Sequence, residues 1–267
     1  MIRRAAVAGL FYDGSGRALR PQVEDLVPRA EEKVKAIGVV VPHAGYLYSG
    51  GVAGAVYGRV NPPETCVVLG PNHSGMGAGA AIMTAGTWET PLGEVTVDPE
   101  LARAIVDRSR VLEEDDRAHR KEHSIEVHLP FLQVLFPGIP FVPICLWSHE
   151  YGACRDVGQA VAEAIRGSSR QVLLIASTDM SHYISHDIAE VKDRTAIEAM
   201  LELDPERLHA TVLRERISMC GFHPTTAMLI AAKALGASRA ELIRYATSGD
   251  VTKDYSSVVG YAGLIIR

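Results

Sequence analysis

Residues 36–46 read Ala36-Ile37-Gly38-Val39-Val40-Val41-Pro42-His43-Ala44-Gly45-Tyr46. The apolar run is short, rich in β-branched residues and closed by turn formers, which is typical of a buried strand in a parallel sheet. Such a strand delivers His43 to a loop at its carboxyl end, where open α/β sheets keep their chemistry. Residues 66–75 repeat this design, because their apolar run is followed by Gly70-Pro71-Asn72-His73 and two small residues. Two histidines placed alike at strand ends predict one shared site.

A third apolar run, residues 171–176, leads into Ser177-Thr178-Asp179 and then His182. Asp179 is close enough in sequence to orient the imidazole of His182, provided that the loop turns the two together. Asp250 follows another predicted strand, in the loop Thr247-Ser248-Gly249-Asp250. Because parallel strands end at the same edge of a sheet, we expect the polar groups at these ends to gather there.

A length of 267 residues fits one large domain or two small ones, and no linker is evident, so we expect a single domain over residues 1–267. The net charge of -5 and the pI near 6.1 argue against a nucleic-acid surface. No apolar segment approaches the length that spans a bilayer. The apolar stretch behind Arg3 and Arg4 ends at Asp13, too early for a signal peptide, so we expect a cytoplasmic protein without a membrane partner. The sequence does not decide the oligomeric state, and a homo-oligomer is one of the alternatives.

The four cysteines are scattered without a Cys-x-x-Cys pair, which excludes a zinc ribbon and a thioredoxin-like motif. Cys66 and Cys145 lie inside apolar runs and are expected to be small buried core residues. Cys220 stands between Met219 and Gly221, where that explanation fits less well.

The spacing of Ile125, Leu129 and Leu132 predicts an amphipathic helix that Pro130 bends. Glu122 and Glu126 would then share one face, with His123 beside Glu126. A polar face that simply meets solvent is the alternative. Elsewhere Ala80 to Val97 indicates an antiparallel excursion, and Asp98-Pro99 predicts a helix start with Asp98 as its cap.

Two imidazoles on rigid strand ends plus one carboxylate form a donor set that holds a divalent metal and leaves positions open for substrate. A further imidazole outside the metal shell is suited to moving protons. The ligands would be distant in sequence, so spacing alone leaves open that these histidines only satisfy local hydrogen bonds.

The sequence resembles the Memo family, named for a mediator of cell motility, whose fold is similar to that of class III extradiol ring-cleaving dioxygenases. The resemblance extends over nearly the whole chain in the expected order. It rests on these segments: Ala8-Gly9-Leu10-Phe11-Tyr12, Pro42-His43-Ala44-Gly45-Tyr46, Gly70-Pro71-Asn72-His73, Glu122-His123-Ser124, His128-Leu129-Pro130, Ser177-Thr178-Asp179, Cys220-Gly221, His223-Pro224 and Ser256 to Gly263.

The resemblance implies an α/β fold, a three-layer α/β/α sandwich around a mixed, largely parallel sheet, with a metal-capable pocket at the strand ends. It makes His43 and His73 metal-ligand candidates, joined in animal members by a cysteine late in the chain. Ungapped matching puts Val251 opposite that cysteine, and this stretch has no thiol. Asp250 next to it would restore a carboxylate as the third metal ligand, a set that suits Fe(II), whereas a thiolate would favour zinc or copper.

The first hypothesis for function is a non-haem iron, dioxygenase-type oxidoreductase acting on a small molecule. His182, oriented by Asp179, would be its acid/base, with His123 nearby, and Tyr46 and Tyr183 would stack on an aromatic substrate. The second is a scaffold that keeps the pocket to bind a ligand or peptide without chemistry. The third is a zinc-dependent hydrolase with the same histidines and a carboxylate base, Glu122 or Asp179.

Overall fold

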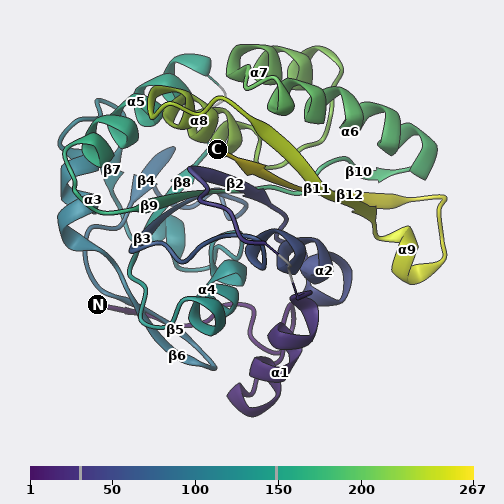
Figure 1. Cartoon of the computed structure of the whole chain (residues 1–267), viewed down its shortest axis with the longest axis horizontal. Coiled ribbons are helices and arrows are strands. Elements are labelled where there is room, and N and C mark those ends of the chain that lie inside the picture. Colours follow the sequence, from purple (N-terminus) through teal and green to yellow (C-terminus); the bar gives the residue numbers. More distant parts are fainter. Residues whose placement is uncertain (30–31, 148–149) are drawn as a thin grey trace.

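A computed structural model describes residues 1–29, 32–147 and 150–267 of the chain (Figure 1). A mixed sheet, nine-stranded within these residues, forms the centre, in the order β10-β12-β2-β9-β3-β8-β4-β7 with β11 also paired to β12. The inner strands β2, β9, β3 and β8 run parallel, and the antiparallel pairs lie to either side. The strands are β2 (Gly38–Val41), β3 (Thr65–Pro71), β4 (Ala80–Ile82), β7 (Glu113–Glu114), β8 (Phe141–Leu146), β9 (Val172–Ser177), β10 (His182–Ile184), β11 (Ala240–Thr247) and β12 (Val258–Ile266).

Every residue of β2, β3, β8 and β9 is buried. These four strands are continuous apolar runs rather than alternating ones, which is the pattern of strands covered on both faces. The prediction of a buried parallel strand ending just before His43 is therefore confirmed, and so is the burial of Cys66 and Cys145.

Helices cover both faces of the sheet, which gives the three layers that the family resemblance implies. In Figure 1, α2 lies with α1 and α4 on one side, while α5 to α8 lie on the other. The helices are α1 (Gly16–Leu26), α2 (Tyr46–Tyr57), α3 (Pro99–Val106), α4 (Leu129–Leu135), α5 (Tyr151–Arg166), α6 (His186–Leu201), α7 (Pro205–Arg214), α8 (Phe222–Ala234) and α9 (Gly249–Thr252). None of the helices in the described ranges has both the length and the apolar character needed to span a bilayer.

The excursion after β4 forms a separate small sheet, β1-β5-β6, in which the hairpin of β5 and β6 is antiparallel as predicted. Its strands are β1 (Ile2–Arg3), β5 (Thr87–Thr90) and β6 (Gly93–Thr96). The helix start behind it is also confirmed, because the Asp98 side chain accepts from the backbone N–H of Leu101 and Pro99 begins α3.

The segment before α4 differs from its prediction. Instead of one bent helix, a short 3₁₀ turn (Glu126–His128) precedes α4, and Glu122 and His123 lie in an irregular loop. Pro130 stands in the first turn of α4, where its missing N–H costs nothing, so the helix begins there rather than bending. Glu122, Glu126 and His128 are buried, so the alternative of a solvated polar face is wrong as well.

Buried polar contacts around Glu126 and Arg3 hold the N-terminal segment against this loop. Glu126 pairs with Arg3 and accepts from the backbone N–H of Ala6 and Val7 and from the Tyr12 hydroxyl. Arg3 also donates to the backbone carbonyls of the loop at positions 119 and 122. The first segment of the chain thus holds in place the loop that carries Glu122 and His123.

Candidate metal centre

The strand order brings three polar loops together at one edge of the sheet. β9 lies between β2 and β3, and all three run parallel. His43, Asp179 and His73 each stand two residues beyond the end of their strand. Because parallel strands end at the same edge, these residues meet there, as the sequence predicts.

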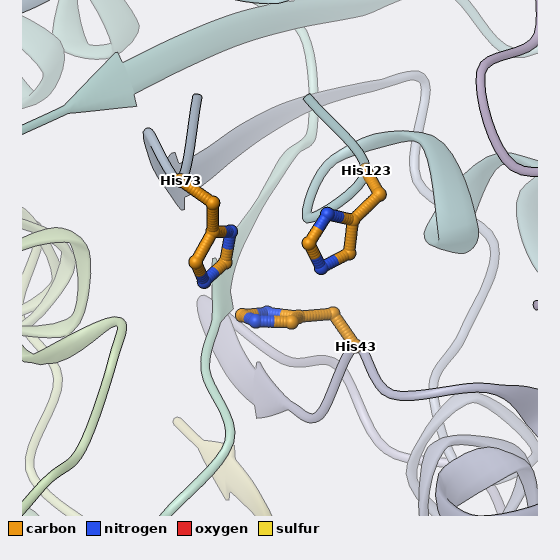
Figure 2. A group of neighbouring side chains, drawn as sticks. All are labelled: His43, His73 and His123. Atoms are coloured by element: carbon orange, nitrogen blue, oxygen red, sulfur yellow. The ribbon is translucent and has the colours of Figure 1, made fainter. Parts of the chain in front are cut away.

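Three histidines form the centre of this edge. Figure 2 shows the rings of His43, His73 and His123 facing one another from three separate segments. One ring nitrogen from each lies within 4.8 Å of the others, a spacing that one metal ion could bridge. The ring centroids are 5.2 Å apart for His43 and His73, 5.6 Å for His43 and His123, and 4.6 Å for His73 and His123.

His43 is the buried member of the group, with 2% of its surface exposed. Its Nδ1 lies 2.7 Å from the Ser177 hydroxyl, and its backbone N–H donates to Oδ1 of Asp179 at 2.8 Å. Burial, together with the neighbouring imidazoles of His73 and His123, holds the pKa of His43 well below its ordinary value. The ring is therefore neutral near pH 7, the form in which an imidazole binds a metal.

His73 stands at the surface, with 35% of its side chain exposed. Its Nδ1 lies 2.9 Å from Oε1 of the buried Glu122, whose other oxygen accepts from the His73 backbone N–H. Glu122 also accepts from the backbone N–H of Ser124 at 2.8 Å. Burial raises the pKa of Glu122, but the hydrogen bonds from His73 and Ser124 outweigh it and lower that pKa to about 2. A carboxylate that orients a ligand histidine in this way is common around protein metal sites.

His123 completes the group from the loop that precedes α4. Its ring stacks on His73 with an interplanar angle of 17°, and Phe11 from the N-terminal segment lies against it at 4.8 Å between ring centroids. Burial lowers the pKa of His123, although Glu122 opposes this effect. On sequence grounds His123 belongs with the proton-transfer residues; in the structure its ring also lies close enough to His43 and His73 for the three to hold one metal ion.

A thiol that the sequence did not assign to the site lies beside His43. Sγ of Cys220 is 3.2 Å from Nε2 of His43, and burial raises the pKa of this thiol. Gly221 permits the approach, because a Cβ there would lie 2.1 Å from the backbone oxygen of Ser177. The stretch around Val251 indeed lacks a thiol, but Cys220 reaches the site from the start of α8. The signals for this in the sequence were its position outside an apolar run and the place of Cys220-Gly221 among the segments of the family resemblance.

Asp250 stands apart from the three histidines. It lies exposed in α9, where its carboxylate accepts from the backbone N–H of Thr247 at 2.9 Å. Among the described residues, the group that converges as potential metal ligands contains the three histidines and not Asp250. Asp250, the predicted third ligand, is therefore not a member of this group in the structure.

Asp179 and His182 are neighbours, but each has another hydrogen-bond partner. Nδ1 of His182 lies 2.9 Å from the Ser218 carbonyl, while Asp179 accepts from His43. Burial raises the pKa of Asp179 to about 6, partly offset by that hydrogen bond. Of the two predicted stacking residues, Tyr46 is buried with its hydroxyl donating to the Val127 carbonyl, whereas Tyr183 is exposed.

The donor set fits a divalent metal. Neutral imidazoles suit iron, zinc and copper, and a nearby thiol shifts a site toward softer metals. The orienting partners of His43 and His73 both lie at Nδ1 of the ring. Nε2 of each ring is therefore the nitrogen available to a metal.

A family model described as Memo-like protein matches residues 3–265 of the chain. The chain belongs to the Memo family. A MEMO1 family protein of Methanothermobacter thermautotrophicus is 45% identical, over 99% of this chain and 100% of its own length. Another, from Methanopyrus kandleri, is also 45% identical over 100% of this chain and 99% of its own length. One from Pyrobaculum aerophilum is 41% identical over 99% and 98%.

The same fold occurs in a solved structure that is distant in sequence. The crystal structure of an uncharacterized protein from Escherichia coli K12 superposes with a TM-score of 0.55 at 14% sequence identity. The match covers 86% of this Memo-family chain and 100% of the other. It supports the α/β sandwich and carries no information on function.

Proposed function

We propose that this Memo-family chain binds one divalent metal ion through His43, His73 and His123. The observation that carries the proposal is the convergence of three ring nitrogens within 4.8 Å from three separate segments. Burial lowers the pKa of His43 and of His123, so both rings are available as neutral ligands. Cys220, 3.2 Å from His43, is an additional donor at the edge of this group.

Ferrous iron is the first metal to test, and the proposed activity is a dioxygenase-type oxidation of a small substrate. Imidazoles alone accept iron, zinc or copper, so the preference for iron rests on the resemblance to the extradiol dioxygenase fold. When bound, iron would supply the redox chemistry with dioxygen.

Asp179 and His182 are the groups suited to hold or move a proton beside the metal. Asp179 is buried with a pKa near 6, so its carboxyl group changes protonation close to neutral pH. The carbonyl of Ser218 faces Nδ1 of His182, which therefore carries a proton and leaves Nε2 as the acceptor in the neutral ring.

Metal analysis of the protein after anaerobic loading with Fe(II), Zn(II) or Cu(II) tests the proposal. We expect about one equivalent bound to the wild type, and loss of at least about 10-fold in affinity in His43→Ala, His73→Ala and His123→Ala. His186→Ala is the matched control, because His186 contacts Thr247 and Tyr255 rather than this group. Absence of metal from the loaded wild type, or equal affinity in all four variants, would reject the metal site and favour the scaffold hypothesis.

Zinc-dependent hydrolysis is the second candidate, and the donor set itself favours it. Three histidines are one of the ligand sets of catalytic zinc, whereas a carboxylate is the expected partner of two histidines on iron. Of the two predicted bases, Asp179 with its pKa near 6 suits the role. Glu122 does not, because its pKa of about 2 and its three hydrogen bonds keep it from accepting a proton. Hydrolysis that Zn(II) restores and Fe(II) does not would select this candidate.

A further inference from the structure

Ser177, the last residue of β9, lies fully buried between two histidines. Its hydroxyl is 2.7 Å from Nδ1 of His43 and 2.8 Å from Nε2 of His128, and it donates to the Ser124 carbonyl at 2.6 Å. At the far end, Nδ1 of His128 lies 2.9 Å from the Tyr57 hydroxyl. These contacts link the candidate metal centre to the core through one continuous set of hydrogen bonds.

The proton positions in this network follow from counting donors. A serine hydroxyl has a single proton, and a carbonyl oxygen can only accept, so the proton of Ser177 goes to Ser124. Both imidazole nitrogens that face the Ser177 oxygen must then be N–H donors. His43 therefore carries a proton on Nδ1, and His128 carries one on Nε2. Nδ1 of neutral His128 is left as the acceptor for the Tyr57 hydroxyl, which closes the network without an unpaired group.

We infer that Ser177 is a positioning residue that fixes the tautomer of His43, so that Nε2 is the nitrogen offered to a metal. The contact on the other side of the ring agrees, because the Cys220 thiol lies 3.2 Å from Nε2 and can donate its S–H there while no metal is bound. Glu122 sets the same choice at His73 by accepting at Nδ1. Ser177 and Glu122 thus leave the same ring nitrogen, Nε2, available to a metal in His43 and in His73.

The inference about metal affinity rests on the proposed metal site, but the tautomer does not. Long-range ¹H–¹⁵N correlation spectra of metal-free protein labelled in histidine distinguish the two neutral tautomers directly. Signals can be assigned by their loss in His43→Gln and His128→Gln. We expect His43 protonated on Nδ1 and His128 on Nε2. A wild-type His43 protonated on Nε2 would overturn the inference whether or not the protein binds metal.

Ser177→Ala then tests the consequence for binding. We expect His43 to populate both tautomers and the affinity for Zn(II) or Fe(II) to fall by about 10- to 100-fold, as for other partners of ligand histidines. Ser177→Thr, which keeps a hydroxyl, should restore the Nδ1–H tautomer. Tyr57→Phe is the matched control, because it removes a hydroxyl from the same network without touching His43, and should leave affinity within about twofold.

The two proposals fail separately. A wild type that has the Nδ1–H tautomer but binds no metal rejects the metal site and leaves the proton assignment standing. A Ser177→Ala variant that keeps both the tautomer and the affinity of the wild type rejects the role of Ser177. If Ser177→Ala does not fold, the role of Ser177 is tested by the wild-type spectrum together with the Ser177→Thr and Tyr57→Phe variants.

Discussion

His43 and His73 stand at equivalent places, each two residues beyond the end of a parallel strand, β2 and β3, yet their ring nitrogens are held by different kinds of partner. His43 is buried and its Nδ1 faces a neutral hydroxyl, Ser177, within a network of uncharged groups. His73 is about one-third exposed and its Nδ1 faces the carboxylate of Glu122. A neutral hydroxyl and a carboxylate can thus each orient a histidine so that Nε2 is available to a metal. The two arrangements should differ in their sensitivity to mutation and to acid.

The largest effect is expected on the His73 side. Glu122→Ala removes the acceptor of three donors at once, the backbone and ring N–H of His73 and the backbone N–H of Ser124. Leaving these three donors without their carboxylate acceptor, the buried Ser124 N–H among them, should lower the free energy of unfolding by about 3 kcal/mol or more, measured by urea denaturation of metal-free protein. Glu113→Ala, at an exposed position, is the control and should change it by about 0.5 kcal/mol or less. Equal stabilities would mean that Glu122 does not hold this loop.

On the His43 side, Ser177→Ala should cost less. The substitution leaves the buried ring N–H of His43 without its acceptor, while His128 keeps a hydrogen bond to the backbone of Ser124. The hydrogen bonds lost here join neutral groups and are weaker than those to a carboxylate. We expect a loss of about 1–3 kcal/mol in the free energy of unfolding, below that of Glu122→Ala. Tyr57→Phe should cost about 1 kcal/mol. Were Ser177→Ala the more damaging of the two, the uncharged network rather than the carboxylate would be the stronger support of the site.

Acid should also affect the stability of the His43 side and of the His73 side differently. Burial lowers the pKa of His128 to about 3, so this ring stays neutral in the folded protein while it would protonate near pH 6.5 when unfolded. The neutral ring of His128 therefore makes its full contribution to the free energy of unfolding above pH 6.5, and this contribution is lost as the pH falls from 6.5 toward 3. Glu122, with a pKa lowered from 4.5 to about 2, stays ionised in the folded protein, so its contribution to stability is complete above pH 4.5 and is lost only as the pH falls from there toward 2.

The measurement is the free energy of unfolding at successive pH values between about 6.5 and 4. His128→Gln cannot titrate, so its pH dependence should be shallower than that of the wild type by up to about 1.4 kcal/mol per pH unit. Parallel curves for the two proteins would contradict the assignment of a neutral buried His128.

Much of this fold follows from local sequence, because its central strands are uninterrupted apolar runs with turn formers at their ends. The same runs placed His43, His73 and Asp179 at one edge. The loop around Glu122 could not be predicted in this way, since its shape depends on tertiary contacts: Gly70 leaves room for Ser124, and Glu126 fastens the N-terminal segment. The periodicity of its apolar residues therefore suggested a helix that begins too early.

The third donor of the proposed metal site shows the same limit of sequence reasoning. Cys220 and His123 reach the site from segments far from His43 in the chain, and only the packing of α8 and of the N-terminal segment brings them there. Asp250 had the right residue type behind a predicted strand. Its carboxylate instead closes a local turn onto the backbone of Thr247, a role that residue type alone does not distinguish from metal binding.

The smallest expected effect is that of Asp250→Asn. The amide oxygen can still accept from Thr247, so the free energy of unfolding should change by about 0.5 kcal/mol or less. Metal affinity should stay within about twofold of the wild type, whereas His123→Gln should lower it by about 10-fold or more, because His123, unlike Asp250, belongs to the group with His43 and His73. Titration of both variants with Zn(II) under the same conditions makes the comparison. A loss of affinity in Asp250→Asn that equals the loss in His123→Gln would show that α9 closes over the site when metal binds, and would restore the carboxylate as a ligand.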